Sequence, residues 1–255
     1  MHTGINYYKV RRFSTTTIAM PELPELTSLH VSSARFISED QISIDLPTTI
    51  AYDQPITIHA QPNTDIWRQT PDVERNNAPT RLISTPIGIH KFHSARATVS
   101  ANWNTLYDQG GLLLFIPGED TTIWIKTGIE FFKGETFVES AVTIRGCDWA
   151  LEPLGKEKGG KLTIQVEREV KDGEKQDSLW IYVVDEETGR KVELRQVTWW
   201  FAPDIRNQKI SKETDKRCLL IGLYAARPTV PSGEGREHEE LVVKFERFEV
   251  KLFDD

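Results

Sequence analysis

The sequence predicts an all-β sandwich or jelly roll, and two observations carry this prediction. Short segments that alternate apolar and polar residues, or are rich in β-branched residues, follow one another along most of the chain, and almost none has a helical period. Turn signals such as Pro117-Gly118, Gly134-Glu135 and Asp172-Gly173 separate these segments. Many short strands at this spacing are typical of a sandwich or jelly roll.

The strands expected in the main domain can be placed by residue number. They are residues 95–102, 112–116, 122–126, 129–132, 137–145, 161–170, 178–184, 191–201, 217–225 and 241–253. Charge alternates along residues 244–251, which indicates an edge or surface strand with a bulge. Residues 61–86 and 202–216 are expected to be long loops, and such loops often carry function. Residues 152–160 are expected to form a solvated turn.

Three segments follow from this pattern. Residues 1–28 are expected to be a flexible tail. Residues 29–60 include strand-like stretches at 29–37, 41–46 and 55–59, and we expect a β-rich extension that packs on the main domain. Residues 61–255 are expected to form one β domain, because sandwiches often reach this length without dividing.

Composition excludes several classes of function. The net charge of −7 and a pI near 5.5 argue against a nucleic-acid partner, since no basic stripe is present. The longest apolar run, residues 112–116, is far below the roughly 20 residues that cross a bilayer, so no membrane partner is expected. Only Cys147 and Cys218 occur, and no Asn-x-Ser/Thr sequon does, which favours free thiols and the cytoplasm. A weakly basic N-terminus leaves a mitochondrial location as the alternative.

The most informative segment for function is residues 124–132. Because side chains alternate along a strand, Ile123, Ile125, Ile129 and Phe131 would face the core. Trp124, Lys126 and Glu130 would then share the opposite face, beside the apolar strand at 112–116. An apolar ring next to one acid and one base suits a small polar ligand. The alternative is an ordinary exposed ion pair.

Seven motifs, in this order, resemble the concanavalin A-like jelly rolls of unknown function that include fungal regulation-of-enolase proteins. They are Asp65-Ile66-Trp67, Tyr107-Asp108-Gln109-Gly110-Gly111-Leu112-Leu113, Trp124-Ile125-Lys126-Thr127-Gly128-Ile129-Glu130-Phe131, Val142-Thr143 leading to Cys147-Asp148-Trp149-Ala150, Val166-Glu167-Arg168, Leu194-Arg195-Gln196, and Ile221-Gly222-Leu223-Tyr224-Ala225-Ala226-Arg227-Pro228. The resemblance covers roughly residues 62–252, and residues 1–60 lie outside it. Cys147 and Ala150 stand where this family usually has serines.

This resemblance implies a two-sheet concanavalin A-like jelly roll with the lectin/glucanase fold. It also suggests non-catalytic binding of a carbohydrate or related small polar metabolite on a sheet face, with a regulatory role in carbohydrate metabolism. Four tryptophans would stack on the apolar side of a sugar: Trp67, Trp124, Trp149 and Trp199. Six polar residues would bind hydroxyls or a ligand carboxylate: Asp108, Gln109, Lys126, Glu130, Asp148 and Arg195. Core packing is the alternative for each tryptophan.

Two other classes of function remain open. A glycosidase-like enzyme could use Asp108, Glu130 and Asp148 as acid and base, but the Glu-x-Asp-x-x-Glu run of laminarinase-like jelly rolls is absent. A protein-interaction module would instead present a flat patch with exposed tryptophans. A pocket over Trp124, Lys126 and Glu130 would favour a small ligand. No cofactor and no metal are expected, because His90 and His93 have no accompanying ligand cluster.

Overall fold

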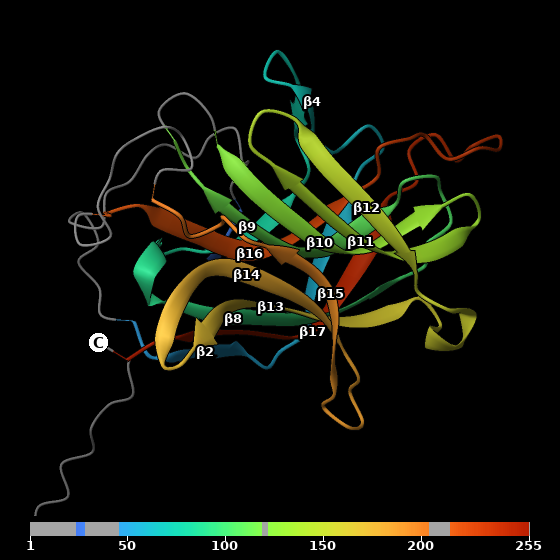
Figure 1. The fold of residues 1–255 in the computed structure, drawn as a ribbon. Helices are drawn as coiled ribbons and strands as arrows, with labels where there is room; N and C mark the ends of the chain where they lie inside the picture. The colour runs from blue at the N-terminus through green and yellow to red at the C-terminus, as the bar shows by residue number, and fades with distance from the viewer. Residues whose placement is uncertain (1–23, 29–45, 119–121, 204–214, 255) are drawn as a thin grey trace, which may run out of the picture.

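Two large antiparallel sheets stack face to face in the computed structural model, which describes residues 24–28, 46–118, 122–203 and 215–254 (Figure 1). The chain is a jelly-roll β-sandwich. The described part contains strands and short 3-10 turns and no α-helix. No helix in those ranges is long and apolar enough to span a membrane.

The first sheet, called here the β10 sheet, has eight strands. In spatial order they are β1 (Leu26–Thr27), β6 (Thr80–Ile83), β16 (Cys218–Ala226), β9 (Gln109–Ile116), β10 (Ile123–Phe132), β11 (Glu135–Thr143) and β12 (Cys147–Pro153), with β7 (Ile87–Gly88) paired to β16. The strand β9 lies between β16 and β10, and every residue of it is buried. Because other parts of the protein cover both faces of this strand, side chains on both faces are apolar, which explains its continuous apolar run.

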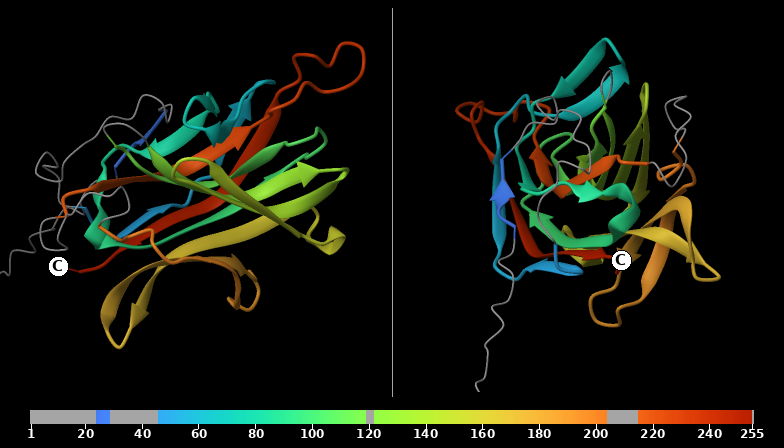
Figure 2. Two further views of the ribbon diagram at one scale, coloured as in Figure 1. Left: turned by 45° about the horizontal axis from the view of Figure 1, so that its top comes forward. Right: turned by 90° about the vertical axis from the view of Figure 1, so that its left-hand side faces the viewer.

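The second sheet, called here the β8 sheet, has seven strands. In spatial order they are β15 (Lys191–Val197), β14 (Glu174–Val184), β13 (Lys161–Lys171), β8 (Phe92–Ala101), β17 (Leu241–Leu252) and β2 (Thr49–Tyr52), with β3 (Ile56–Ala60) also paired to β17. Two 3-10 turns, Ile89–Lys91 and Lys156–Lys158, lie between strands. The hairpin of β4 (Ile66–Thr70) and β5 (Val73–Asn76) lies on the face of the β10 sheet that points away from the β8 sheet (Figure 2).

Apolar side chains form two layers. The main core lies between the sheets, where Ile125 and Ile129 of β10 pack with residues such as Val99 and Phe245 of the β8 sheet. A smaller layer lies between the β10 sheet and the hairpin, and it includes Ile66. The predicted alternation of β10 is therefore confirmed: its isoleucines enter the main core, and Trp124, Lys126 and Glu130 lie on the hairpin side.

Several expectations about the strands were wrong. Residues 123–132 form one strand rather than two, because β9 and β11 pair with it along its length. Residues 61–86 contain β4, β5 and β6 rather than one loop, and β12 extends into the turn expected at 152–160. Residues 198–201 leave the predicted strand as a turn.

The strand β17 is not an edge strand, since β8 flanks it on one side and β2 and β3 on the other. Its outward side chains are exposed, and this gives it the charge pattern of an edge. The expected bulge is present: the register shifts between Glu246 and Phe248, and Arg247 has φ 61°. A left-handed residue is a common way to accommodate the extra position of a bulge.

The N-terminal expectations fall partly outside the described residues. The strand-like stretches at 29–37 and 41–45 lie there, as do residues 1–23 of the predicted tail. Within the described part, Leu26 and Thr27 pair with β6, so this end of the expected tail is a strand of the β10 sheet. The strands β2 and β3 hydrogen-bond to β17 and are part of the sandwich itself.

Candidate functional site

The floor of the candidate site is the hairpin-side face of the β10 sheet. Antiparallel pairing aligns Tyr224 of β16, Gly111 of β9, Gly128 of β10 and Glu139 of β11 in one row. The two glycines leave a gap in the side-chain layer, and the Tyr224 hydroxyl crosses it to donate a hydrogen bond to Glu139 Oε2 at 2.7 Å. A Cβ on Gly128 would lie 2.1 Å from the carbonyl oxygen of Gly110, so the strands themselves require glycine here.

Lys126 lies in the adjacent row and is almost fully buried. Its ammonium donates to Gln109 Oε1, pairs with Glu139 Oε1 at 3.0 Å and approaches Asp65 Oδ1 at 3.9 Å. Burial alone would lower the pKa of Lys126, but the neighbouring acids, Glu139 first and then Asp65, outweigh it and raise the pKa above the ordinary value. Lys126 is therefore a charged group inside the fold, held by acids.

Glu130 lies one pair further along β10 and is also buried. The indole N–H of Trp149 donates to its Oε2 at 3.1 Å. Burial, followed by the charge of Glu139, raises the pKa of Glu130 to about 9, although Lys126 opposes the shift. The carboxyl group is accordingly protonated at neutral pH, and it can donate as well as accept a hydrogen bond.

Asp65 precedes β4 and brings a third carboxyl group to this floor. Its pKa is raised, chiefly by burial, while Lys126 acts in the opposite direction. Within the described residues, Oδ1 of Asp65 is buried and accepts no hydrogen bond, and the ammonium of Lys126 is an ion-pair partner at 3.9 Å. An unmade hydrogen bond at a buried acceptor is costly. Asp65 therefore has unused hydrogen-bond acceptor capacity in a residue that lines the cavity described next.

Above this floor is a cavity of about 300 Å³ with aromatic walls. Its lining residues are Asp65, Trp67, Tyr107, Gln109, Lys126, Glu130, Trp149 and Pro228. The rings of Trp67 and Trp149 meet edge to face, with centroids 6.3 Å apart. Trp149 also contacts Phe132, on which Tyr107 stacks. Such linked aromatic rings fix the shape of the walls.

The hairpin that carries Trp67 is fastened to the sheet by Arg68. This side chain is 3% exposed, and its Nη1 donates to the carbonyl oxygens of Thr122 at 2.9 Å and Ile144 at 3.1 Å. Its Nη2 pairs with Glu74 on the returning strand β5. Because these contacts are made entirely by protein groups, they fix the position of Trp67 over the β10 sheet and make the cavity a part of the fold.

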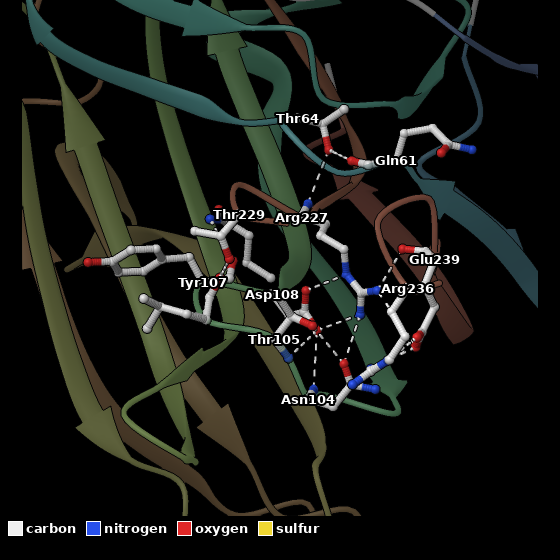
Figure 3. A network of polar contacts seen from close by, with 12 residues as sticks. Gln61, Thr64, Asn104, Thr105, Tyr107, Asp108, Arg227, Thr229, Arg236 and Glu239 are labelled. Carbon is white, nitrogen blue, oxygen red and sulfur yellow. Dashed lines mark hydrogen bonds and ion pairs between the residues drawn. The ribbon is translucent and has the colours of Figure 1, made fainter. Parts of the chain in front are cut away.

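A second buried network lies beside the cavity, around Asp108 and Arg227 (Figure 3). Arg227 donates to both carboxylate oxygens of Asp108, at 2.8 Å each, and also to Glu239 O and Asn104 Oδ1. The second carboxylate oxygen, Oδ2, also accepts the backbone N–H groups of Asn104 and Thr105. The two charged residues adjoin three lining residues in sequence, namely Tyr107, Gln109 and Pro228. The network therefore positions these three lining residues.

The structure brings five of the ten predicted ligand-binding residues to this cavity: Trp67, Gln109, Lys126, Glu130 and Trp149. Trp124 does not line it, because its ring is fully buried in the apolar layer beneath the hairpin. Asp108 does not line it either, since Arg227 occupies both of its oxygens.

The remaining three, Asp148, Arg195 and Trp199, lie in a different groove of about 350 Å³. Successive residues of a strand face opposite ways, so Asp148 points away from the cavity that Trp149 lines. Arg195 of β15 donates to Asp148 Oδ2 at 2.6 Å and joins the edges of the two sheets. Trp199 is half-buried there, while its neighbour Trp200 is in the main core.

The three carboxylates considered for glycoside hydrolysis consequently do not meet. Asp108 is held by Arg227, Asp148 faces the other groove, and Glu130 alone lines the cavity. Across the described ranges, no group of three or more His, Cys, Asp and Glu side chains is arranged to hold a metal ion.

Sequence reasoning missed several residues of the site. They are Asp65, Tyr107 and Pro228 in the lining, and Glu139 and Tyr224 beneath it. The alternation of Val138 and Val142 places Glu139 on the hairpin face, and this signal was available. Tyr224 sits in an apolar strand and gave no such signal, because its partner depends on the register of four strands.

Comparisons with known proteins agree with this fold. A model of the family described as "Protein of unknown function (DUF1349)" matches residues 45–252 and so takes in β2 and β3. An uncharacterized protein of Emericella nidulans is 38% identical over 199 residues, which cover 78% of this chain and 86% of that protein.

Two matches come from Saccharomyces cerevisiae. Regulation of enolase protein 1 is 28% identical over 102 residues, which cover 39% of this chain and 48% of that protein. The crystal structure of a functionally unknown protein has a TM-score of 0.56 at 19% identity, over 82% of this chain and 98% of that one. This second likeness is one of fold.

Proposed function

Starting from the premise that this chain belongs to the DUF1349 family of unknown function, we propose that it binds a carbohydrate or related small polar metabolite in the cavity between Trp67 and Trp149, without catalytic turnover. One observation carries the proposal. The cavity is a part of the fold, its walls are aromatic, and buried polar groups converge on its floor, which is the usual build of a small-molecule site.

The size of the cavity supports a ligand of about one sugar ring. Its volume of about 300 Å³ is at the lower end of the range of small-molecule pockets. Trp67 and Trp149 offer apolar faces to the C–H side of a ring. Gln109, Glu130 and Asp65 offer acceptors and donors to its hydroxyl groups. A concave site of this volume favours a small ligand over a flat protein contact.

Binding without turnover fits the way the acids are arranged. Neither Asp108 nor Asp148 faces the cavity, so the acid and base pair suggested by the sequence is not assembled there. The name of the Saccharomyces cerevisiae relative, Regulation of enolase protein 1, supports adding a regulatory role in carbohydrate metabolism and a protein partner to the proposal. The composition supports a cytoplasmic location.

A thermal-shift screen tests this proposal, because a ligand that binds only the native state raises the melting temperature. The panel holds neutral sugars, amino sugars, sugar acids and sugar phosphates. We expect at least one sugar to stabilise the wild type and Asp148→Ala, which changes the other groove, but not Trp67→Ala. Stabilisation lost in Asp148→Ala and kept in Trp67→Ala would contradict the proposed site. No stabilisation by any member of the panel would overturn the proposal.

A further inference from the structure

We propose that the cavity selects a ligand in which an ammonium group accompanies hydroxyl groups, with an amino sugar as the simplest example. This inference rests on the proposed function and narrows its ligand class. It comes from the balance of charge around the cavity, from one buried acceptor that makes no hydrogen bond, and from the aromatic walls.

Acids outnumber bases around the cavity. The carboxyl groups come from three elements: Asp65 precedes β4, Glu130 is on β10 and Glu139 is on β11. Among the described residues, Lys126 is the one basic side chain that lines the cavity. Glu130 is protonated in the absence of a cation, so the charge of Lys126 stands against two carboxylates, Asp65 and Glu139. Since one ammonium compensates one carboxylate, a cationic ligand would balance the remaining negative charge.

The other titratable groups that face this cluster do not change the balance. Tyr224 of β16 has a pKa raised well above its ordinary value by burial, and burial raises the pKa of Cys147 of β12 to about 12. Both are therefore neutral. Arg75 of β5 lowers the pKa of Asp65 through its charge, but it is exposed and does not line the cavity.

Lys126 is poorly placed to receive an anionic ligand. The ammonium of Lys126 has three hydrogens to donate. It already donates a hydrogen bond to Gln109 and forms ion pairs with Glu139 and Asp65. A carboxylate or phosphate in the cavity would meet the carboxylate of Asp65, and no uncommitted cation is present among the described lining residues. Like charges at close range disfavour such a ligand.

Asp65 supplies the positive argument. Its Oδ1 is buried and accepts no hydrogen bond within the described residues, and it belongs to a residue that lines the cavity. A hydroxyl group would satisfy the hydrogen bond alone, whereas an ammonium would satisfy both the hydrogen bond and the charge. Glu130 can also pair with the ammonium. Its carboxyl group is protonated in the free protein, and an adjacent cation favours the ionised form.

The walls suit the same ligand. Trp67, Trp149 and Tyr107 line the cavity, and the faces of such rings attract a cation within about 6 Å of the ring centroid. The rings also cover the C–H side of a sugar. Acids at the floor and aromatic rings around it would thus bind the two halves of one amino sugar.

The test is isothermal titration of the full chain with matched sugars, at a pH at which the amino group is protonated. The probes are glucosamine, galactosamine and mannosamine, each beside its parent sugar, its N-acetyl derivative and the corresponding uronic acid. We expect at least one amino sugar to bind about tenfold or more tightly than its three counterparts, the preference that one charge-assisted hydrogen bond supplies.

Three variants test whether the preference for the amino sugar depends on the carboxyl groups of the cavity. Glu130→Gln and Asp65→Asn remove a carboxylate and keep the shape, so both should bind the amino sugar and its N-acetyl derivative with similar affinity. Glu152→Gln, an exposed position on β12, should keep the wild-type preference.

The ranking for the wild type decides the question even if one variant does not fold. A parent sugar or uronic acid that binds as tightly as the amino sugar overturns this inference and leaves the proposed function standing. Absence of binding across all of these probes overturns this inference, and it overturns the proposed function as well when the thermal-shift panel, with its sugar phosphates, is also silent.

Discussion

The guanidinium of Arg227 holds Asp108 by two parallel hydrogen bonds, Nε to Oδ1 and Nη2 to Oδ2, each 2.8 Å long. Both side chains are buried, at 1% and 0% exposure. Asp108 follows Tyr107, whose φ of 67° turns the chain into β9, and Arg227 precedes Pro228. The ion pair therefore joins two turns that contribute residues to the cavity lining.

This pair predicts a large loss of stability when one partner is removed. Asp108→Asn leaves the buried Arg227 charge without its carboxylate, which should lower the free energy of unfolding by about 3–5 kcal/mol. Asp148→Asn is the matched control, because Asp148 also pairs with an arginine but is 76% exposed, and it should cost about 0–1 kcal/mol. Urea denaturation of both variants checks this. Equal losses would contradict the structural role of Asp108.

Lys126 and Glu130 should differ in their effect on stability. Lys126→Met leaves Glu139 and Asp65 buried without their shared cation, so it should cost about 3–5 kcal/mol. Glu130→Gln replaces a protonated carboxyl by an amide of the same shape, and at neutral pH it should cost much less. Denaturation curves at one pH compare the two variants. The reverse order would show that Lys126 is not the centre of the cluster.

Glu130 should also make stability depend on pH. Its pKa is raised from 4.5 to about 9 in the folded protein, so between these values the folded state keeps a proton that the unfolded state loses. Its contribution is fully present below about pH 4.5 and declines by up to about 1.4 kcal/mol per pH unit as the pH rises toward 9. Relative to the wild type, Glu130→Gln should therefore become progressively more stable over this range. A difference that stays constant with pH would contradict the raised pKa.

Adding even one methyl group at Gly128, which pairs with Gly111 in the floor of the cavity, should destabilise the fold. Gly128→Ala would place a Cβ 2.1 Å from Gly110 O, so β9 and β10 must separate, at a cost of about 1–3 kcal/mol. The same change at Gly134, where a Cβ would meet nothing within 4 Å but φ is 88°, probes backbone strain alone. Thermal unfolding of the two variants, together with ligand binding by Gly128→Ala, measures the difference. Unchanged binding and stability in Gly128→Ala would refute a tightly packed floor.

The sequence predicted those features of the fold that can be read from the residues of a single strand. The alternation of β10 correctly placed Lys126 and Glu130 on the face away from the core, and the apolar run of β9 correctly indicated a covered strand. Five of the ten residues predicted to bind a ligand line one cavity, and Trp67 and Trp149 among them lie in motifs of the family resemblance. Their binding of a ligand stays a prediction.

What the sequence did not predict depends on pairing between distant segments. Asp108 resembled a ligand group because nothing in its own segment shows that Arg227, 119 positions later, occupies both of its oxygens. Trp124 shares a strand face with Lys126, yet the hairpin covers it, and a hairpin inside a predicted loop cannot be anticipated from alternation. Asp148 and Trp149 are consecutive in a strand, so their side chains point to opposite faces of the sheet. This difference could have been predicted.

The indole N–H resonances of the seven tryptophans provide the most direct test of the central claim that the cavity is the binding site. Nuclear magnetic resonance of the wild type, titrated with the tightest-binding sugar of the panel, should shift the signals of Trp67 and Trp149, which line the cavity. The signal of Trp199, in the other groove, should stay unchanged. Shifts at Trp199 with none at Trp67 and Trp149, or no shift with any sugar, would contradict the account.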